Sequence, residues 1–295
     1  KMNSIFIRNY ENFMLFFTFF LFWVSIQFGE VAEDFLAYVM VISVGILHGA
    51  NDLLILSTKD QKDKKLIKNL LIYIGIILLC VVIYLLSSFL AIVLFVVLSA
   101  YHFGEEHLSY KINVNFGFNA VYFLSYGLFI FALLFYQSLS DVDVIMTELT
   151  GRTFSKTQIE ITLITSAIFL GAGTVFLILT KRNESVLFLR EFLYLVLLFF
   201  VFNTSSLILG FAIYFILWHS IPSIIHQIEF ISGNLNKKNV ISYVKKALIY
   251  WIISIAGLLF LYQLLPEIKL LATVIFVILF AVTAPHTWVM HRMKN

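Results

Sequence analysis

Long apolar stretches recur along the whole chain and alternate with short polar or basic segments. Each is close to the roughly 20 residues that an α-helix needs to cross the hydrocarbon core of a bilayer. We find no alternation of apolar and polar residues with period two, which would indicate transmembrane β-strands. The pattern therefore predicts an all-α, polytopic transmembrane helical bundle of about ten spans, within a range of eight to ten. The expected spans are 13–28, 35–56, 69–86, 89–108, 116–137, 158–179, 187–202, 206–231, 247–265 and 269–291.

The segments between the spans set the orientation. We expect a lysine-rich loop at 57–68, a polar loop at 138–157 and a basic segment at 233–246. With both termini cytoplasmic, all but three of the 20 Lys and Arg residues lie on the cytoplasmic side. Positive residues favour that side, so charge supports the span count and the orientation together. We see no repeat and no soluble segment, and we expect residues 1–295 to form a single integral-membrane domain.

Composition agrees with this assignment. The chain is 61% apolar and 13% charged, whereas soluble domains are about 45–50% apolar and about 25% charged. The basic residues lie between spans and not on one continuous face, which argues against nucleic-acid binding. The single cysteine, Cys80, excludes an intrachain disulfide.

All seven histidines lie in four short clusters on spans that run from outside to inside. The first histidine of each cluster, His48, His102, His219 or His286, therefore lies in the inner half of the bilayer. Ionisable residues inside a membrane are costly unless they pair, bind an ion or line a wet cavity. Because imidazole binds iron, zinc, copper and nickel, four imidazoles at a similar depth predict a metal site.

Two carboxylates follow these histidines at helical spacing. Asp52 lies four residues after His48, and Glu106 lies four residues after His102, so each pair shares one helix face. Metal-bound histidines often donate their other ring N–H to a carboxylate. We therefore expect Asp52 and Glu106 to support the ligands.

The other three histidines have weaker assignments. His107 and His291 lie five residues beyond the first histidines of their clusters, where we expect them to be solvated or to support a ligand. His226 has two open interpretations, as a ligand or as a residue with a structural or surface role.

Glycines and a proline lie close to the predicted ligands. Gly45, Gly49 and Gly104 allow neighbouring helices to approach closely or leave room for a ligand. Pro222 removes a backbone N–H one turn after His219 and is expected to redirect that helix.

Aromatic side chains lie beside the histidines in the sequence. Tyr101, Trp218 and Trp288 are compatible with an interfacial aromatic belt or with the wall of a pocket for a conjugated substrate. Together with Phe103, they are our candidates for the substrate pocket.

The four clusters together resemble the Brp/Blh family of membrane β-carotene 15,15′-dioxygenases. The matching motifs are GILHGAND at Gly45–Asp52, His102-Phe103-Gly104, Trp218-His219-Ser220 with Pro222, and Pro285-His286. They occur in the family's order over nearly the whole chain. The resemblance implies non-haem iron, Fe(2+), and cleavage of the central double bond of β-carotene with O₂ into two all-trans retinal molecules.

The resemblance also ranks the ligands. It assigns His48, His102 and His219 most strongly. Some members carry a second histidine one turn after the Trp-His pair, where this chain has Ser223. His286 is therefore expected as the fourth ligand, with Asp52, Glu106, Ser223 and His226 as supporting residues.

The resemblance further implies a multi-pass protein of a bacterial inner (plasma) membrane, whose retinal is passed to a rhodopsin. A carotenoid dissolves in the bilayer and is about as long as its ~30 Å hydrocarbon core. We therefore expect access between helices into a long apolar tunnel that the histidines meet near its middle.

Two other functions remain open from the sequence. A di-iron lipid or carotenoid hydroxylase or desaturase would carry dense HxxxH and HxxHH boxes, which are missing here. A histidine-based metal or proton transporter would need ionisable residues along a path across the bilayer. The histidines of this chain are expected at one depth.

Overall fold

The structure, a computed structural model, describes residues 4–59, 63–112, 116–180, 185–264 and 271–294. All regular secondary structure in these ranges is helical, as predicted. The helices are α1 Ser4–Gln27, α2 Glu30–Met40, α3 Ile46–Gly49, α4 Asp52–Lys59, α5 Asp63–Leu86, α6 Ser88–Leu108, α7 Phe116–Gln137, α8 Leu139–Thr150, α9 Lys156–Thr180, α10 Ser185–Thr204, α11 Leu207–Ile213, α12 Ile221–Ser232, α13 Lys237–Leu264 and α14 Leu271–Lys294. Two π-helical segments, Val41–Gly45 and Tyr214–Ser220, join α2 to α3 and α11 to α12.

Eight helical stretches of the described residues are long and apolar enough to cross a membrane. They are Glu30–Lys59, Lys65–Leu86, Ser88–Leu108, Gly117–Gln137, Lys156–Thr180, Leu187–Thr204, Leu207–Ser232 and Lys237–Gly257. Helices α1 and α14, which the sequence predicts as spans, are not among these eight. The structure thus supports a polytopic helical protein, while the expected total of ten spans and the cytoplasmic termini remain predictions.

Two predicted connecting segments contain helix. The expected polar loop at 138–157 includes α8, which buries Val142, Met146 and Leu149 along one face and ends at Gly151 with φ +67°. Acidic residues on the opposite face hid this helical periodicity in the sequence. The expected basic segment at 233–246 turns at Gly233, with φ +77°, and then enters α13 at Lys237.

Close packing of α6 against α7 fixes the centre of the bundle. A Cβ atom at Gly104 would lie 1.9 Å from the backbone oxygen of Phe123, and one at Gly127 would lie 1.9 Å from that of Ala100. Small residues let two helix backbones approach closely inside a membrane. The close approach expected at Gly104 is thereby confirmed.

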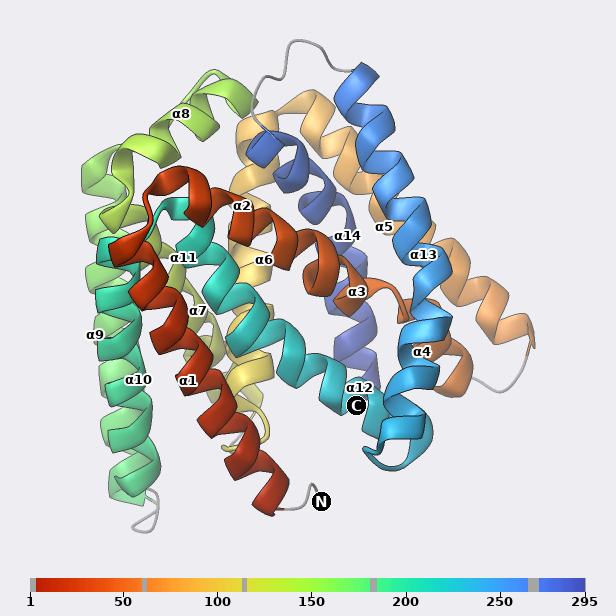
Figure 1. The fold of residues 1–295 in the computed structure, drawn as a ribbon, viewed down its shortest axis with the longest axis horizontal. Helices are drawn as coiled ribbons and strands as arrows, with labels where there is room; N and C mark the ends of the chain where they lie inside the picture. Colours follow the sequence, from red (N-terminus) through yellow and green to blue (C-terminus); the bar gives the residue numbers. More distant parts are fainter. Residues whose placement is uncertain (1–3, 60–62, 113–115, 181–184, 265–270, 295) are drawn as a thin grey trace.

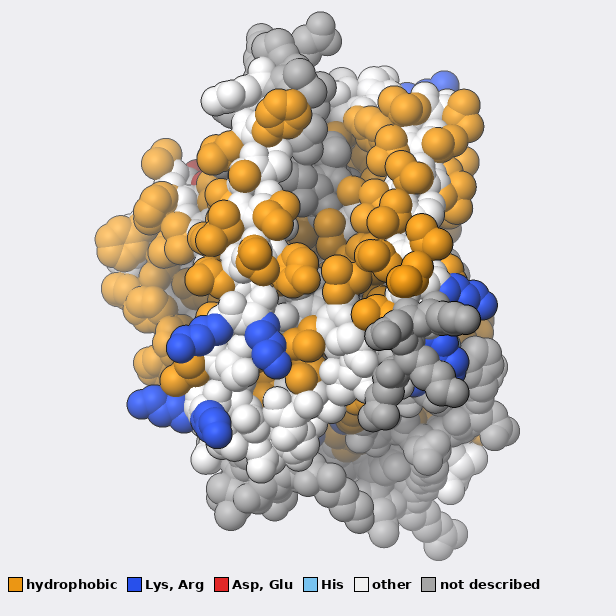
Figure 2. All heavy atoms as spheres, turned by 90° about the vertical axis from the view of Figure 1, so that its right-hand side faces the viewer, with side chains coloured by type: hydrophobic (Ala, Val, Ile, Leu, Met, Phe, Trp, Pro, Cys, Tyr) orange, Lys and Arg blue, Asp and Glu red, His pale blue; other side chains and the backbone are white. Residues whose placement is uncertain are grey.

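The outer faces of α5 and α13 are apolar. Exposed large side chains on them include Leu71, Leu85, Ile249 and Ile253. Figure 2 shows apolar side chains over the upper part of this face and Lys and Arg gathered below. This separation suits a surface that contacts lipid tails above and charged headgroups or water below.

Candidate metal centre

Four segments that run in one direction through the bundle (Figure 1) each carry a buried histidine. His48 lies in α3, His102 in α6, His219 in the second π-helical segment and His286 in α14. The ring centroid of His48 lies 4.4 Å from that of His286 and 5.0 Å from that of His219. The ring of His102 lies 4.7 Å from that of His219 and 5.2 Å from that of His286. The fold thus brings together all four histidines that the sequence singled out.

The ring nitrogens fit a metal ion. One nitrogen each of His48, His102 and His286 forms a set in which all atoms lie within 4.8 Å of one another. The Nε2 atoms of His48 and His286 are 2.8 Å apart, and two nitrogens each about 2.1 Å from one ion would be separated by a similar distance. Nδ1 of His48, both nitrogens of His102 and Nδ1 of His219 have no hydrogen-bond partner among the described residues. Buried polar atoms without partners are costly, and a bound cation would satisfy some of these lone pairs.

Asp52 supports His286, not His48 as the spacing suggested. Its Oδ1 lies 2.7 Å from Nδ1 of His286, and Tyr73 donates its hydroxyl to Oδ2 at 3.0 Å. The helix breaks between Gly49 and Asp52, so the one-face rule for a continuous helix does not apply. Because a carboxylate accepts, His286 carries its proton on Nδ1 and directs the Nε2 lone pair towards His48.

A buried polar chain holds the backbone at His48. Gln227 donates from Nε2 to the carbonyl oxygen of His48 at 3.1 Å, and its Oε1 accepts from the hydroxyl of Tyr243 at 2.7 Å. Ser223 Oγ accepts from the same Gln227 amide at 3.4 Å. The predicted supporting residue Ser223 thus acts on Gln227. No spacing rule in the sequence indicated Gln227 or Tyr243.

Glu106 and His226 pair with each other. Glu106 Oε1 lies 2.7 Å from His226 Nδ1, and Lys294 Nζ lies 3.0 Å from Glu106 Oε2. The ring of Tyr110 stacks on His226 with centroids 3.8 Å apart. Burial, together with the nearby Glu106 carboxylate, raises the pKa of Tyr110, so its phenol stays neutral. Glu106 is therefore engaged in an ion pair and makes no hydrogen bond to His102.

His107 and His291 have different surroundings. The side chain of His107 is only 8% exposed, and its Nε2 lies 2.6 Å from Glu191, which also pairs with Lys111. The expectation that His107 is solvated is therefore wrong, and the printed partners of its Nε2 are Glu191 and Lys111, not a central histidine. The side chain of His291 is 42% exposed and faces Glu105 at 3.4 Å, as expected for a residue near the interface.

Only one of the four predicted substrate-pocket residues lines the cavity that contains the histidines. Phe103 does so, with its ring 4.4 Å from that of His219. Tyr101 donates instead to Glu105 at 3.1 Å, and Trp218 donates to Thr18 at 3.2 Å. Trp288 lies beside the guanidinium group of Arg292.

The histidine cavity extends sideways between two helices. Besides the four imidazoles, it is lined by Leu70, Ile74 and Ile77 of α5 and by Ile253 and Ser254 of α13. These helices carry the apolar outer face seen in Figure 2. The cavity is therefore directed towards the surface that suits lipid.

Both π-helical segments lie at a central histidine: the first ends at Gly45, shortly before His48, and the second contains His219. A Cβ at Gly45 would lie 2.9 Å from the ring of Phe215, so this glycine lets the two segments meet. Pro222 lies at the start of α12, just after the second segment. π-Helical turns are rare and are frequent at functional sites, and nothing in the hydrophobic pattern predicted them.

Comparison with known proteins agrees with this geometry. Residues 39–294 match the family described as Beta-carotene 15,15'-dioxygenase, and this range includes all four central histidines. Neither the curated proteins nor the solved structures give a match. The match covers most of the chain and confirms the resemblance noted from the four motifs. The chain belongs to the β-carotene 15,15′-dioxygenase family.

Proposed function

We propose that this protein cleaves the central 15,15′ double bond of β-carotene with O₂ and that it uses one iron ion, Fe(2+). The double bond breaks and each of its carbons takes one oxygen atom. One β-carotene and one O₂ therefore give two retinal molecules, with no other reductant. The observation that carries the proposal is the convergence of four buried imidazoles, several with unpaired nitrogens, in a chain of this family.

The imidazoles hold the ion in this proposal. His48, His102 and His286 provide the nitrogens that lie within 4.8 Å of one another, and His219 lies against the same rings. Asp52 keeps His286 in the tautomer whose Nε2 lone pair faces the centre. A ferrous ion bound there would supply the redox chemistry that lets O₂ react with an alkene.

The apolar walls position the polyene. Phe103 and Phe215 lie beside the imidazoles, with ring centroids 4.4 Å from His219 and 6.4 Å from His48, respectively. They leave a water-poor surface for a conjugated chain and exclude competing solvent. The opening between α5 and α13 lets a substrate dissolved in the membrane reach the centre from the side.

The experiment is to express the protein in bacterial cells that accumulate β-carotene and to quantify carotene and retinal in the extracts. We expect two retinals for each carotene lost, with one iron per purified chain. Chelation should abolish activity, and ferrous iron should restore it. Two irons per chain would instead support a di-iron hydroxylase or desaturase, and metal flux in proteoliposomes would support a transporter.

A matched pair of histidine variants provides the control. His102→Ala removes a buried imidazole from the centre and should eliminate both retinal and bound iron. His291→Ala removes a half-exposed imidazole outside the centre and should leave both unchanged. A wild-type protein that is folded, loaded with iron and unable to produce retinal would overturn the proposal.

A further inference from the structure

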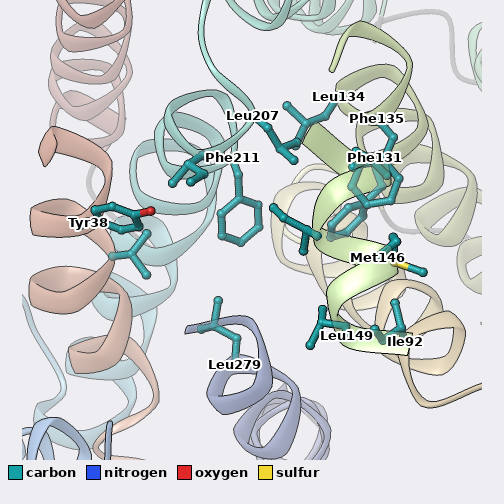
Figure 3. A pocket seen from close by; sticks show the side chains of 14 residues that line it. Tyr38, Ile92, Phe131, Leu134, Phe135, Met146, Leu149, Leu207, Phe211 and Leu279 are labelled. Atoms are coloured by element: carbon teal, nitrogen blue, oxygen red, sulfur yellow. The ribbon is translucent and has the colours of Figure 1, made fainter. Parts of the chain in front are cut away.

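A second cavity lies against α8, which contributes part of its lining. Fourteen side chains line it, and Figure 3 shows how they face one another across the space. Only Tyr38 among them carries a hydroxyl group, and none is charged. Nothing in the proposed chemistry at the histidines accounts for this cavity.

The α8 cavity adjoins the histidine cavity. Leu279 lines both of them. Phe211 of the α8 cavity stacks on Phe215 of the histidine cavity, with centroids 5.2 Å apart. Phe131 stacks in the same way on Phe103 at 5.4 Å. The two cavities therefore meet at Leu279 and at these two stacked pairs of aromatic rings, each of which contributes one ring to either cavity.

The four segments that carry the central histidines also reach the α8 cavity, always on their N-terminal side. On α14, the lining residue Leu279 precedes His286 by seven residues. Ile92 precedes His102 by ten residues, and Tyr38 precedes His48 by ten. Leu207 precedes His219 by twelve residues. At 1.5 Å per residue, the cavity extends from about 10 to about 18 Å from the imidazoles.

Helix α8 forms the end wall. Val142, Ile145, Met146 and Leu149 recur at spacings of three and four residues and line the cavity. Val144 lies on the other face and is exposed. Helix α8 packs against α6, α7 and α14, so the wall is tied to helices that carry central histidines.

This depth matches half of a carotene. A molecule about as long as the ~30 Å hydrocarbon core has its central bond about 15 Å from either end. We propose, resting on the function proposed above, that the α8 cavity holds one terminal ring of the carotene. The α8 wall then sets how deeply the ring inserts and thus which double bond lies at the imidazoles. Met146 and Leu149 are the specificity-determining residues.

Filling the cavity tests this assignment through the products. In Met146→Trp, the ring inserts less deeply, so the bond at the imidazoles moves towards the inserted ring. We expect an unequal pair of products, one shorter and one longer than retinal. Because a displacement of about 1 Å can cost about 100-fold in rate, retinal formation should fall by about that factor. Leu149→Ala, which enlarges the cavity without adding bulk, should also increase the share of unequal products.

Val144→Trp is the matched control, because it adds the same side chain to the exposed face of α8. It should yield two retinals at the wild-type rate. Iron content should be unchanged in all three variants, since none lies near the imidazoles. If Met146→Trp and Leu149→Ala produce only retinal, α8 does not set how deeply the ring inserts, and the proposed function remains intact.

A binding measurement tests the cavity independently of cleavage. The chelated protein, purified from cells that accumulate β-carotene, should retain carotene, and Met146→Trp should lose most of it while Val144→Trp should not. If the wild-type protein does not cleave β-carotene, the proposed function is overturned. The binding measurement would still show whether the α8 cavity holds the ring of the carotene. Carotene retained equally by all variants, or a phospholipid found in place of carotene, would overturn the ring site.

Discussion

The seven histidines fall into two groups, four at the centre of the bundle and three outside it, although all of them lie in the same four sequence clusters. His48, His102, His219 and His286 turn their rings towards one another. The other three each face a carboxylate on another helix: His107 with Glu191, His226 with Glu106, and His291 with Glu105. Burial alone does not separate the groups, because the side chain of His107 is only 8% exposed.

The difference between the groups lies in what surrounds the nitrogens. At the centre, the nearest polar neighbours of an imidazole are mostly other imidazoles, which can share a cation but cannot neutralise one another. In the outer group, each imidazole has a carboxylate partner; Lys111 also pairs with Glu191, and Lys294 also pairs with Glu105 and Glu106. The outer clusters thus need no ion, whereas the centre is left with lone pairs that an ion would use.

The largest effect should come from removing a central ligand. His286→Ala deletes one of the three nitrogens within 4.8 Å of one another, and we expect iron content and retinal formation to fall below detection. His219→Ala should be milder and retain measurable iron, because His219 is outside that set. Iron analysis of the two purified variants checks this order, and the reverse order would assign the third ligand to His219.

A smaller effect should follow from changing the carboxylate behind His286. In Asp52→Asn, the amide can donate to Nδ1 and favour the tautomer whose Nε2–H faces the centre. Loss of such a supporting carboxylate typically costs about 10–100-fold in metal affinity or activity. Tyr73→Phe leaves the carboxylate in place and serves as the milder control. Titration with ferrous iron measures both variants, and wild-type affinity in Asp52→Asn would contradict the tautomer argument.

These cases show how far the sequence could predict the site. The four central histidines could be selected because apolar spans run in one direction and bring their residues to a common depth. The partner of Asp52 could not be predicted, because the helix breaks at Ala50 and Asn51 and this break turns the carboxylate towards another helix. Contacts of this kind depend on tertiary packing, which periodicity does not encode.

The same limit applies to the fold. Most spans could be placed within a few residues, because hydrocarbon thickness fixes the length of an apolar helix. Helix α8 was missed because its buried stripe is short and its exposed face carries Asp143. The two π-helical segments were missed because they keep the apolar pattern of an α-helix while shifting its face.

The smallest effect on the metal centre should come from the outer group, even where the effect on stability is large. Glu191→Gln removes the charge that His107 and Lys111 share, and Lys111 is left with an uncompensated charge. Because the Lys111 side chain is 23% exposed, losing this pair should cost less than the roughly 3–5 kcal/mol of a fully buried pair, but the melting temperature in detergent should still fall. Iron per folded chain and the two-retinal stoichiometry should remain at wild-type values, because Glu191 makes no contact with the central imidazoles. A Glu191→Gln protein that stays folded but loses iron would join the two histidine groups into one coupled network and remove the distinction between them.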